Sequence, residues 1–183
     1  MCADYFCIIP QKRSIMVHKI LLPTDFSIES LNVLKHYLQK NSKDTLLDVV
    51  LVHGQTLSDS ISELLFFSKY RMLKELNIEH FEDAVKILQN KYDSKLRNVH
   101  IDIFTGHNQS AFENYLTGNK IDEIVLSEQL SFKQHNKKSF DITRFALKAD
   151  IPVTKLNCDQ EVSSNADTAD ISSLFNNNVV MSR

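Results

Sequence analysis

The chain has 183 residues, of which 43% are hydrophobic and 24% charged, and its formal net charge is −2. This length and composition fit one globular domain of about 150 residues with short extensions. Lys and Arg are scattered along the chain, which argues against a nucleic-acid-binding surface. No apolar run approaches the roughly 18 residues of a membrane-spanning helix, so the sequence predicts neither a nucleic-acid nor a membrane partner.

The cysteines and the first sixteen residues indicate the compartment. Cys2, Cys7 and Cys158 form an odd set without CxxC spacing, which argues against a disulfide framework or a zinc site and favours reduced thiols. Near the N-terminus the basic residues follow a brief apolar patch, the reverse of their order in a signal peptide. We therefore expect a cytoplasmic protein.

The first predicted helix follows the first predicted strand after a short turn. The apolar run from Ile20 to Leu22 stops at Pro23, and an amphipathic pattern begins at Ile28. Proline cannot donate a hydrogen bond to a sheet, and Asp25 and Ser27 are preferred helix N-cap residues. In open α/β sheets ligands bind at the carboxyl ends of the strands, so this turn lies where a site is expected.

The remaining pattern alternates between strands and helices. Near-continuous apolarity from Leu46 to Val52 predicts a strand buried on both faces and closed by His53-Gly54. The later expected elements are helical patterns at 61–65 and 73–88 with a break near Asn77, a strand at 100–104, a helix at 109–116, a strand at 121–126, a polar loop at 127–138, a helix at 140–149 and a strand at 151–156. This order predicts a doubly wound parallel α/β sheet with right-handed crossovers.

The two ends of the chain lack this alternation. We expect an N-terminal extension at 1–16, one domain at 17–157 and a polar, disordered tail at 158–183. The tail contains one small apolar cluster, Ile171, Leu174 and Phe175.

Four motifs in order resemble the universal stress protein family: KILLPTDFS at 19–27, VVLVHG at 49–54, the unit from Gly106 to Leu126, and RFALKADIPV at 144–153. The match covers roughly residues 17–156. The resemblance implies a three-layer, adenine nucleotide alpha hydrolase-like sheet of five parallel strands in the order 3-2-1-4-5. It also implies a homodimer paired through the fifth strand.

The chain departs from the family after the fourth predicted strand. ATP-binding members carry Gly-x-x-Gly, nine residues and then Gly-Ser or Gly-Thr, because backbone N–H groups must approach the phosphates closely. Here Ser127 and Leu130 stand at the first two glycine positions, and Ser139-Phe140 stands at the last pair. Glu128 adds a negative charge beside the loop, whereas Lys133, Lys137 and Lys138 would attract phosphate or form a solvated surface.

The resemblance assigns five cofactor-binding positions: Pro23, Thr24, Asp25, Gly54 and Ser127. Each has a structural alternative, since Asp25 can serve the cap of the first helix and Gly54 can be a simple turn. The sequence contains no HExxH, GxSxG, Walker A or GxGxxG motif, so we name no catalytic or metal-binding residue. His53 follows an apolar strand and is predicted to be a hydrogen-bonded core histidine.

Three functions remain open at this point. The first is a non-catalytic stress-response or regulatory module that has lost the usual ATP-binding loop and carries no cofactor. The second is a universal stress protein that binds ATP or another adenine nucleotide through an atypical phosphate loop, with at most weak hydrolysis. The third is an unrelated flavodoxin-like domain, which would have another strand order. The run from Leu64 to Phe67 cannot face one side of a helix entirely, so part of it would cover a pocket or meet a partner.

Overall fold

The computed structural model describes residues 16–41, 45–58, 60–129 and 131–157. The N-terminal extension, Leu130 and the tail therefore lie outside the described residues, apart from Met16. Within the described ranges the strands are β1 (Val17–Pro23), β2 (Leu46–Gln55), β3 (Leu96–Phe104), β4 (Glu123–Ser127), β5 (Ser139–Phe140) and β6 (Val153–Leu156). The helices are α1 (Ile28–Lys40), α2 (Ile61–Leu65), α3 (Lys69–Glu75), α4 (Glu79–Lys91), α5 (Gln109–Asn119) and α6 (Thr143–Ala146).

Five parallel strands form the sheet in the order β3-β2-β1-β4-β6, and the short β5 pairs antiparallel with β2. Counting only the parallel strands in chain order, this is the expected order 3-2-1-4-5. The doubly wound α/β prediction is confirmed, and the strand order removes the support for a different flavodoxin-like arrangement.

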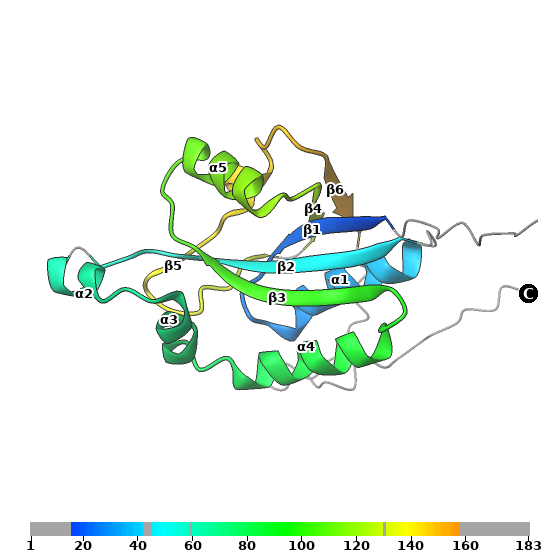
Figure 1. Cartoon of the computed structure of the whole chain (residues 1–183), viewed down its shortest axis with the longest axis horizontal. Helices are drawn as coiled ribbons and strands as arrows, with labels where there is room; N and C mark the ends of the chain where they lie inside the picture. The colour runs from blue at the N-terminus through cyan, green and yellow to red at the C-terminus, as the bar shows by residue number, and fades with distance from the viewer. Residues whose placement is uncertain (1–15, 42–44, 59, 130, 158–183) are drawn as a thin grey trace, which may run out of the picture.

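The sheet is packed on both faces because successive strand residues point to opposite sides. Ile20 and Leu22 join one core with residues of α1 and α4, whereas Leu21 joins a second core with residues of α5 and α6. Figure 1 shows α1 and α4 on one side of the sheet and α5 on the other. The three-layer prediction is therefore confirmed.

The predicted boundaries differ from the structure at two places beside the candidate site. Strand β2 does not close at His53-Gly54 but continues to Gln55, which pairs with β5, and Gly54 pairs with both β3 and β5. The helix expected at 140–149 is reduced to α6, because Phe140 belongs to strand β5 and the Asp141 side chain accepts a hydrogen bond from Thr143 N at 2.8 Å. Strand pairing with β2 thus outweighs the local helical pattern.

Other boundaries are closer to expectation. The helical break near Asn77 is confirmed, since Asn77 has a positive φ of 50° between α3 and α4. The third strand is longer than its apolar core indicated and begins at Leu96. No helix in the described part of the chain is long and apolar enough to cross a membrane.

Candidate functional site

The turn after β1 is built as the sequence indicated. Ser27 is the N-cap of α1, and its hydroxyl accepts a hydrogen bond from Ser30 N at 3.3 Å. Asp25 supports this cap from outside the helix, since its Oδ1 accepts hydrogen bonds from both the N–H and the hydroxyl of Ser27. Between them Phe26 adopts a left-handed backbone with φ 63°.

Thr24 ties this turn to the end of β2. Its backbone N–H donates to Val52 O at 2.9 Å, and its carbonyl oxygen accepts from His53 Nδ1 at 2.8 Å. Its hydroxyl accepts from Phe26 N at 3.0 Å. Thr24 and Asp25 are almost fully buried, at 2% and 5% exposed. Pro23 and Thr24 therefore lie beside Val52 and His53 at the end of β2.

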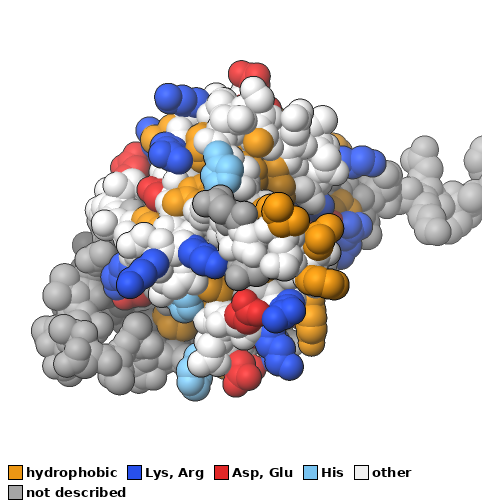
Figure 2. All heavy atoms as spheres, turned by 90° about the vertical axis from the view of Figure 1, so that its left-hand side faces the viewer, with side chains coloured by type: hydrophobic (Ala, Val, Ile, Leu, Met, Phe, Trp, Pro, Cys, Tyr) orange, Lys and Arg blue, Asp and Glu red, His pale blue; other side chains and the backbone are white. Residues whose placement is uncertain are grey.

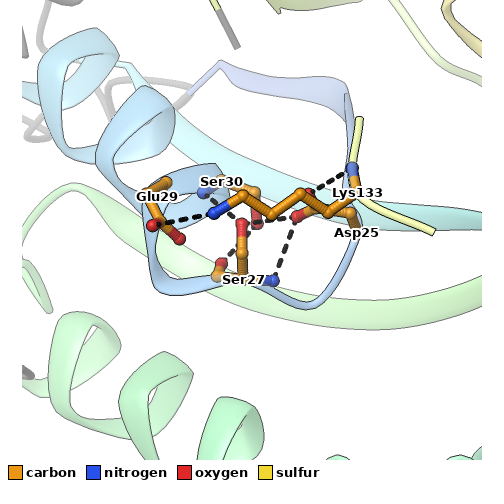
Figure 3. A network of polar contacts seen from close by, with 5 residues as sticks. All are labelled: Asp25, Ser27, Glu29, Ser30 and Lys133. Atoms are coloured by element: carbon orange, nitrogen blue, oxygen red, sulfur yellow. Dashed lines mark hydrogen bonds and ion pairs between the residues drawn. The ribbon is translucent and has the colours of Figure 1, made fainter. Parts of the chain in front are cut away.

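The loop after β4 folds back over this turn. Lys133 N donates to Asp25 Oδ2 at 3.0 Å, and the Lys133 ammonium lies 3.2 Å from Glu29 Oε1. Figure 3 shows the Lys133 side chain lying across the cap toward Glu29. Burial by itself raises the pKa of Glu29, but hydrogen bonds from its own backbone N–H and from Lys133 bring that pKa below its ordinary value.

His53 lies inside a stack of rings that this loop completes. The imidazole is fully buried, with Phe26 at 4.4 Å and Phe132 at 5.8 Å between ring centroids. Its Nε2 lies 2.9 Å from the Ser139 hydroxyl. Burial lowers the pKa of His53, and the nearby His135 lowers it further, against opposing effects of Thr24 O and Asp25. The prediction of a hydrogen-bonded core histidine is confirmed.

Gly54 is covered by the segment that follows the loop. It lies within β2 and pairs with Phe104 on one side and Phe140 on the other. A Cβ at this position would lie 2.3 Å from the Phe140 carbonyl oxygen, so only glycine permits this approach. Gly54 is a close-contact position inside a strand, which corrects the alternative of a simple turn.

Ser127 and Lys138 lie at the same edge of the sheet as the turn after β1. Ser127 ends β4, and its hydroxyl accepts from Gln129 N at 3.2 Å. Lys138 N donates to Asn136 Oδ1 at 2.8 Å, and the Lys138 carbonyl accepts from Thr56 N. A hollow of about 480 Å³ lies between α2 and α3, and another of about 370 Å³ lies beside α6. None of the five expected cofactor-binding residues lines either hollow.

Sequence reasoning missed Phe132 and His135 as parts of this site. Phe132 stacks over His53, and His135 Nε2 lies 2.8 Å from Leu76 O, which ties the loop to the end of α3. An aromatic residue in an otherwise polar loop was the available signal. Among the described residues no group of three or more His, Cys, Asp or Glu is arranged to hold a metal ion.

Comparison with known proteins finds similarity to solved structures but not to protein-family models or curated proteins. Neither a protein-family model nor a curated protein matches this chain. Among solved structures it is similar to the universal stress protein UspA from Lactobacillus plantarum, with 18% identity and a TM-score of 0.51 over 78% of this chain and 99% of that one. The likeness is one of fold.

Two other solved structures have lower scores. A universal stress protein family protein from Arabidopsis thaliana with AMP bound is 17% identical, with a TM-score of 0.45 over 84% of this chain and 99% of that one. A hypothetical protein, MJ0577, is 20% identical, with a TM-score of 0.48 over 79% and 98% of the two chains.

Proposed function

We propose that this chain is a universal stress protein-like, non-catalytic regulatory module whose nucleotide position is filled by its own loop. One observation carries the proposal: residues 132–140 contact Asp25 and Gly54, two positions that the family resemblance assigns to a nucleotide, and cover His53 beside them. Lys133 N is bonded to Asp25, Phe132 covers His53, and β5 covers Gly54.

The chemistry of the filled site supports the same function. Phosphate binding at a turn requires backbone N–H groups that are free to donate. Here the N–H groups of Ser27 and Lys133 already donate to the Asp25 carboxylate, and Glu29 lies on the same side of the helix cap. A phosphate entering this place would break these bonds and approach two carboxylates.

A second candidate is an adenine nucleotide-binding protein with at most weak ATP hydrolysis. The observation that favours it is the Lys133 side chain, which is 69% exposed and is paired with Glu29 beside the cap. If the loop moved away, Pro23, Thr24, Asp25, Gly54 and Ser127 would contact the nucleotide, and Lys133 with Lys137 and Lys138 would attract its phosphates.

Nucleotide content and thermal shift distinguish the two functions. Under the proposed function the purified protein carries no nucleotide by mass spectrometry, releases no phosphate from ATP, and melts at one temperature with or without ATP, AMP or cyclic AMP. Saturable binding to the native state would raise the melting temperature by mass action. A rise that Lys133→Gln reduces and the exposed control Lys148→Gln leaves unchanged would establish the second candidate instead.

We also propose that the module is a cytoplasmic homodimer paired through β6. This strand ends the sheet path and pairs with β4. An unpaired strand edge offers backbone donors and acceptors to a second copy, and a two-fold axis would join the two sheets into one.

A further inference from the structure

Helices α2 and α3 carry an apolar surface that the other described residues leave exposed. We call it the α2–α3 face, made of Ile61, Leu64, Leu65, Phe66, Phe67 and Tyr70. Leu65 and Phe66 are each 76% exposed, and Ile61 and Tyr70 are 77% and 75% exposed. Figure 2 looks onto this end of the molecule, where hydrophobic side chains gather on one side. Contiguous apolar patches of this kind mark interaction sites.

The face contains a groove suited to a short segment of chain. The groove measures about 480 Å³, and its apolar lining consists of Leu57, Leu64, Phe66, Phe67 and Met72. Arg71, Glu75 and Lys138 line it as well, and Arg71 is paired with Glu75 at 3.1 Å, so Lys138 gives the polar rim one excess positive charge. This combination fits an apolar segment with an acidic flank.

The two helices are short, and α3 contacts the core through the partly buried side chains of Met72 and Leu73. They have five and seven residues, neither has a side-chain hydrogen bond at its N-cap, and α3 has no buried residue. Helices this short are unstable without packing. One described anchor of α3 is the Lys69 ammonium, which binds Asp102 Oδ1 at 2.7 Å.

The chain contains one segment of matching chemistry. Ile171, Leu174 and Phe175 have the i, i+3, i+4 spacing that places side chains on one face of a helix. Residues 158–175 contain four acidic side chains and no Lys or Arg. All four acidic side chains precede Ile171, so the segment offers an apolar cluster to the α2–α3 face and one acidic flank to the positive charge of the rim.

The segment is long enough to reach the groove. Strands β2 and β6 run parallel within one sheet, so both end at the same edge of the sheet. Glu128 N bonds to Leu156 O at 3.0 Å, and ten residues later the same loop reaches Lys138 in the groove. Ten residues span at most about 36 Å, whereas the fourteen from Asn157 to Ile171 extend to about 46 Å.

We propose that residues 171–175 dock in the groove of the α2–α3 face of the same chain. The tether keeps the segment at an effective concentration in the millimolar range, so a weak apolar contact is sufficient to cover the face. This inference goes beyond the proposed function and does not depend on whether a nucleotide binds.

Hydrogen exchange on the full chain tests the docking from the side of the groove. The variant Ile171→Ser/Leu174→Ser/Phe175→Ser should exchange its amides at 61–75 about tenfold faster than the wild type. The control Asn176→Ser/Asn177→Ser/Asn178→Ser changes three polar residues beside the segment and should match the wild type. Equal exchange rates at 61–75 in all three proteins would overturn the proposal.

Limited proteolysis tests it from the side of the tail. Chymotrypsin should cleave after Leu174 or Phe175 about tenfold faster in Leu65→Ser/Phe66→Ser, whose altered side chains are exposed, than in the wild type. Leu147→Ser changes an exposed residue elsewhere and should have no effect. Cleavage rates that all three proteins share contradict the docking. A different result would also overturn the proposal: the amides at 61–75 stay protected from hydrogen exchange in Ile171→Ser/Leu174→Ser/Phe175→Ser but lose this protection on dilution. A second copy of the chain would then cover the face.

Discussion

Both carboxylate oxygens of Asp25 accept hydrogen bonds from backbone N–H groups of this chain, one from Ser27 and one from Lys133. The family resemblance predicted a nucleotide contact for this aspartate. Here a buried carboxylate with charge-assisted bonds on both oxygens joins the first helix to a loop more than a hundred residues away. At the scale of single residues, the hydrogen bonds of Asp25 therefore join two distant segments of the same chain.

His53 gives this arrangement a dependence on pH. Its pKa is lowered chiefly by burial, so the native state favours the neutral ring. The stability that depends on this neutral form is complete above about pH 6.5, the ordinary histidine pKa, and is lost below it because the unfolded chain takes up the proton first. We expect the free energy of unfolding to fall from pH 6.5 to 5 by less in His53→Gln than in the wild type.

Urea denaturation at several pH values measures that slope. His80→Gln is the matched control, since His80 is exposed and this variant should keep the wild-type slope. NMR titration of the His53 ring provides a direct check. A His53 pKa at or above 6.5 in the native protein would contradict the expectation.

At the scale of elements, the start of a predicted helix forms strand β5 instead, and β5 covers the end of β2. Ser139-Phe140 pairs with Gly54 and Gln55, and the Ser139 hydroxyl also meets His53. A separate set of polar contacts joins α3 and α5 to β3: the Asp102 carboxylate binds the Lys69 ammonium and accepts a hydrogen bond from the Tyr115 hydroxyl. Burial raises the pKa of Asp102, but these bonds bring it below the ordinary value.

Two glycines provide opposite predictions about these elements. Gly54→Ala would place a Cβ 2.3 Å from the Phe140 carbonyl oxygen, so β5 must move, and we expect a loss of about 1–3 kcal/mol in the free energy of unfolding. Gly118→Ala lies in helix α5 with no atom within 4 Å of the new Cβ, so we expect a gain of about 0.5–1 kcal/mol. Urea denaturation measures both, and a neutral Gly54→Ala would mean that β5 does not press on β2.

At the scale of the whole molecule, the sheet was predictable from the sequence, whereas the contacts of residues 132–140 with Asp25, His53 and Gly54 were not. Apolar runs such as Leu46–Val52 indicate strands buried on both faces. The alternation of these strands with helices then predicts a parallel α/β sheet. By contrast, Phe132 meets His53 across 79 residues of chain, and Phe140 meets Gly54 across 86. Local periodicity carries no signal for such pairs, so the missing glycines indicated a changed loop but not where it lies.

The proposed dimer through β6 yields a prediction from the hydrogen-bond pattern of this strand. Ile124 N donates to Pro152 O and Glu128 N donates to Leu156 O, so alternation turns the backbone of Thr154 toward β4 and that of Lys155 toward the outer edge. Proline is tolerated where the lost N–H faces outward. Lys155→Pro should therefore weaken dimerisation at least tenfold while preserving the fold, whereas Thr154→Pro should also destabilise each copy. Sedimentation velocity over a concentration series measures the association, and a dimer unaffected by Lys155→Pro would exclude pairing through this edge.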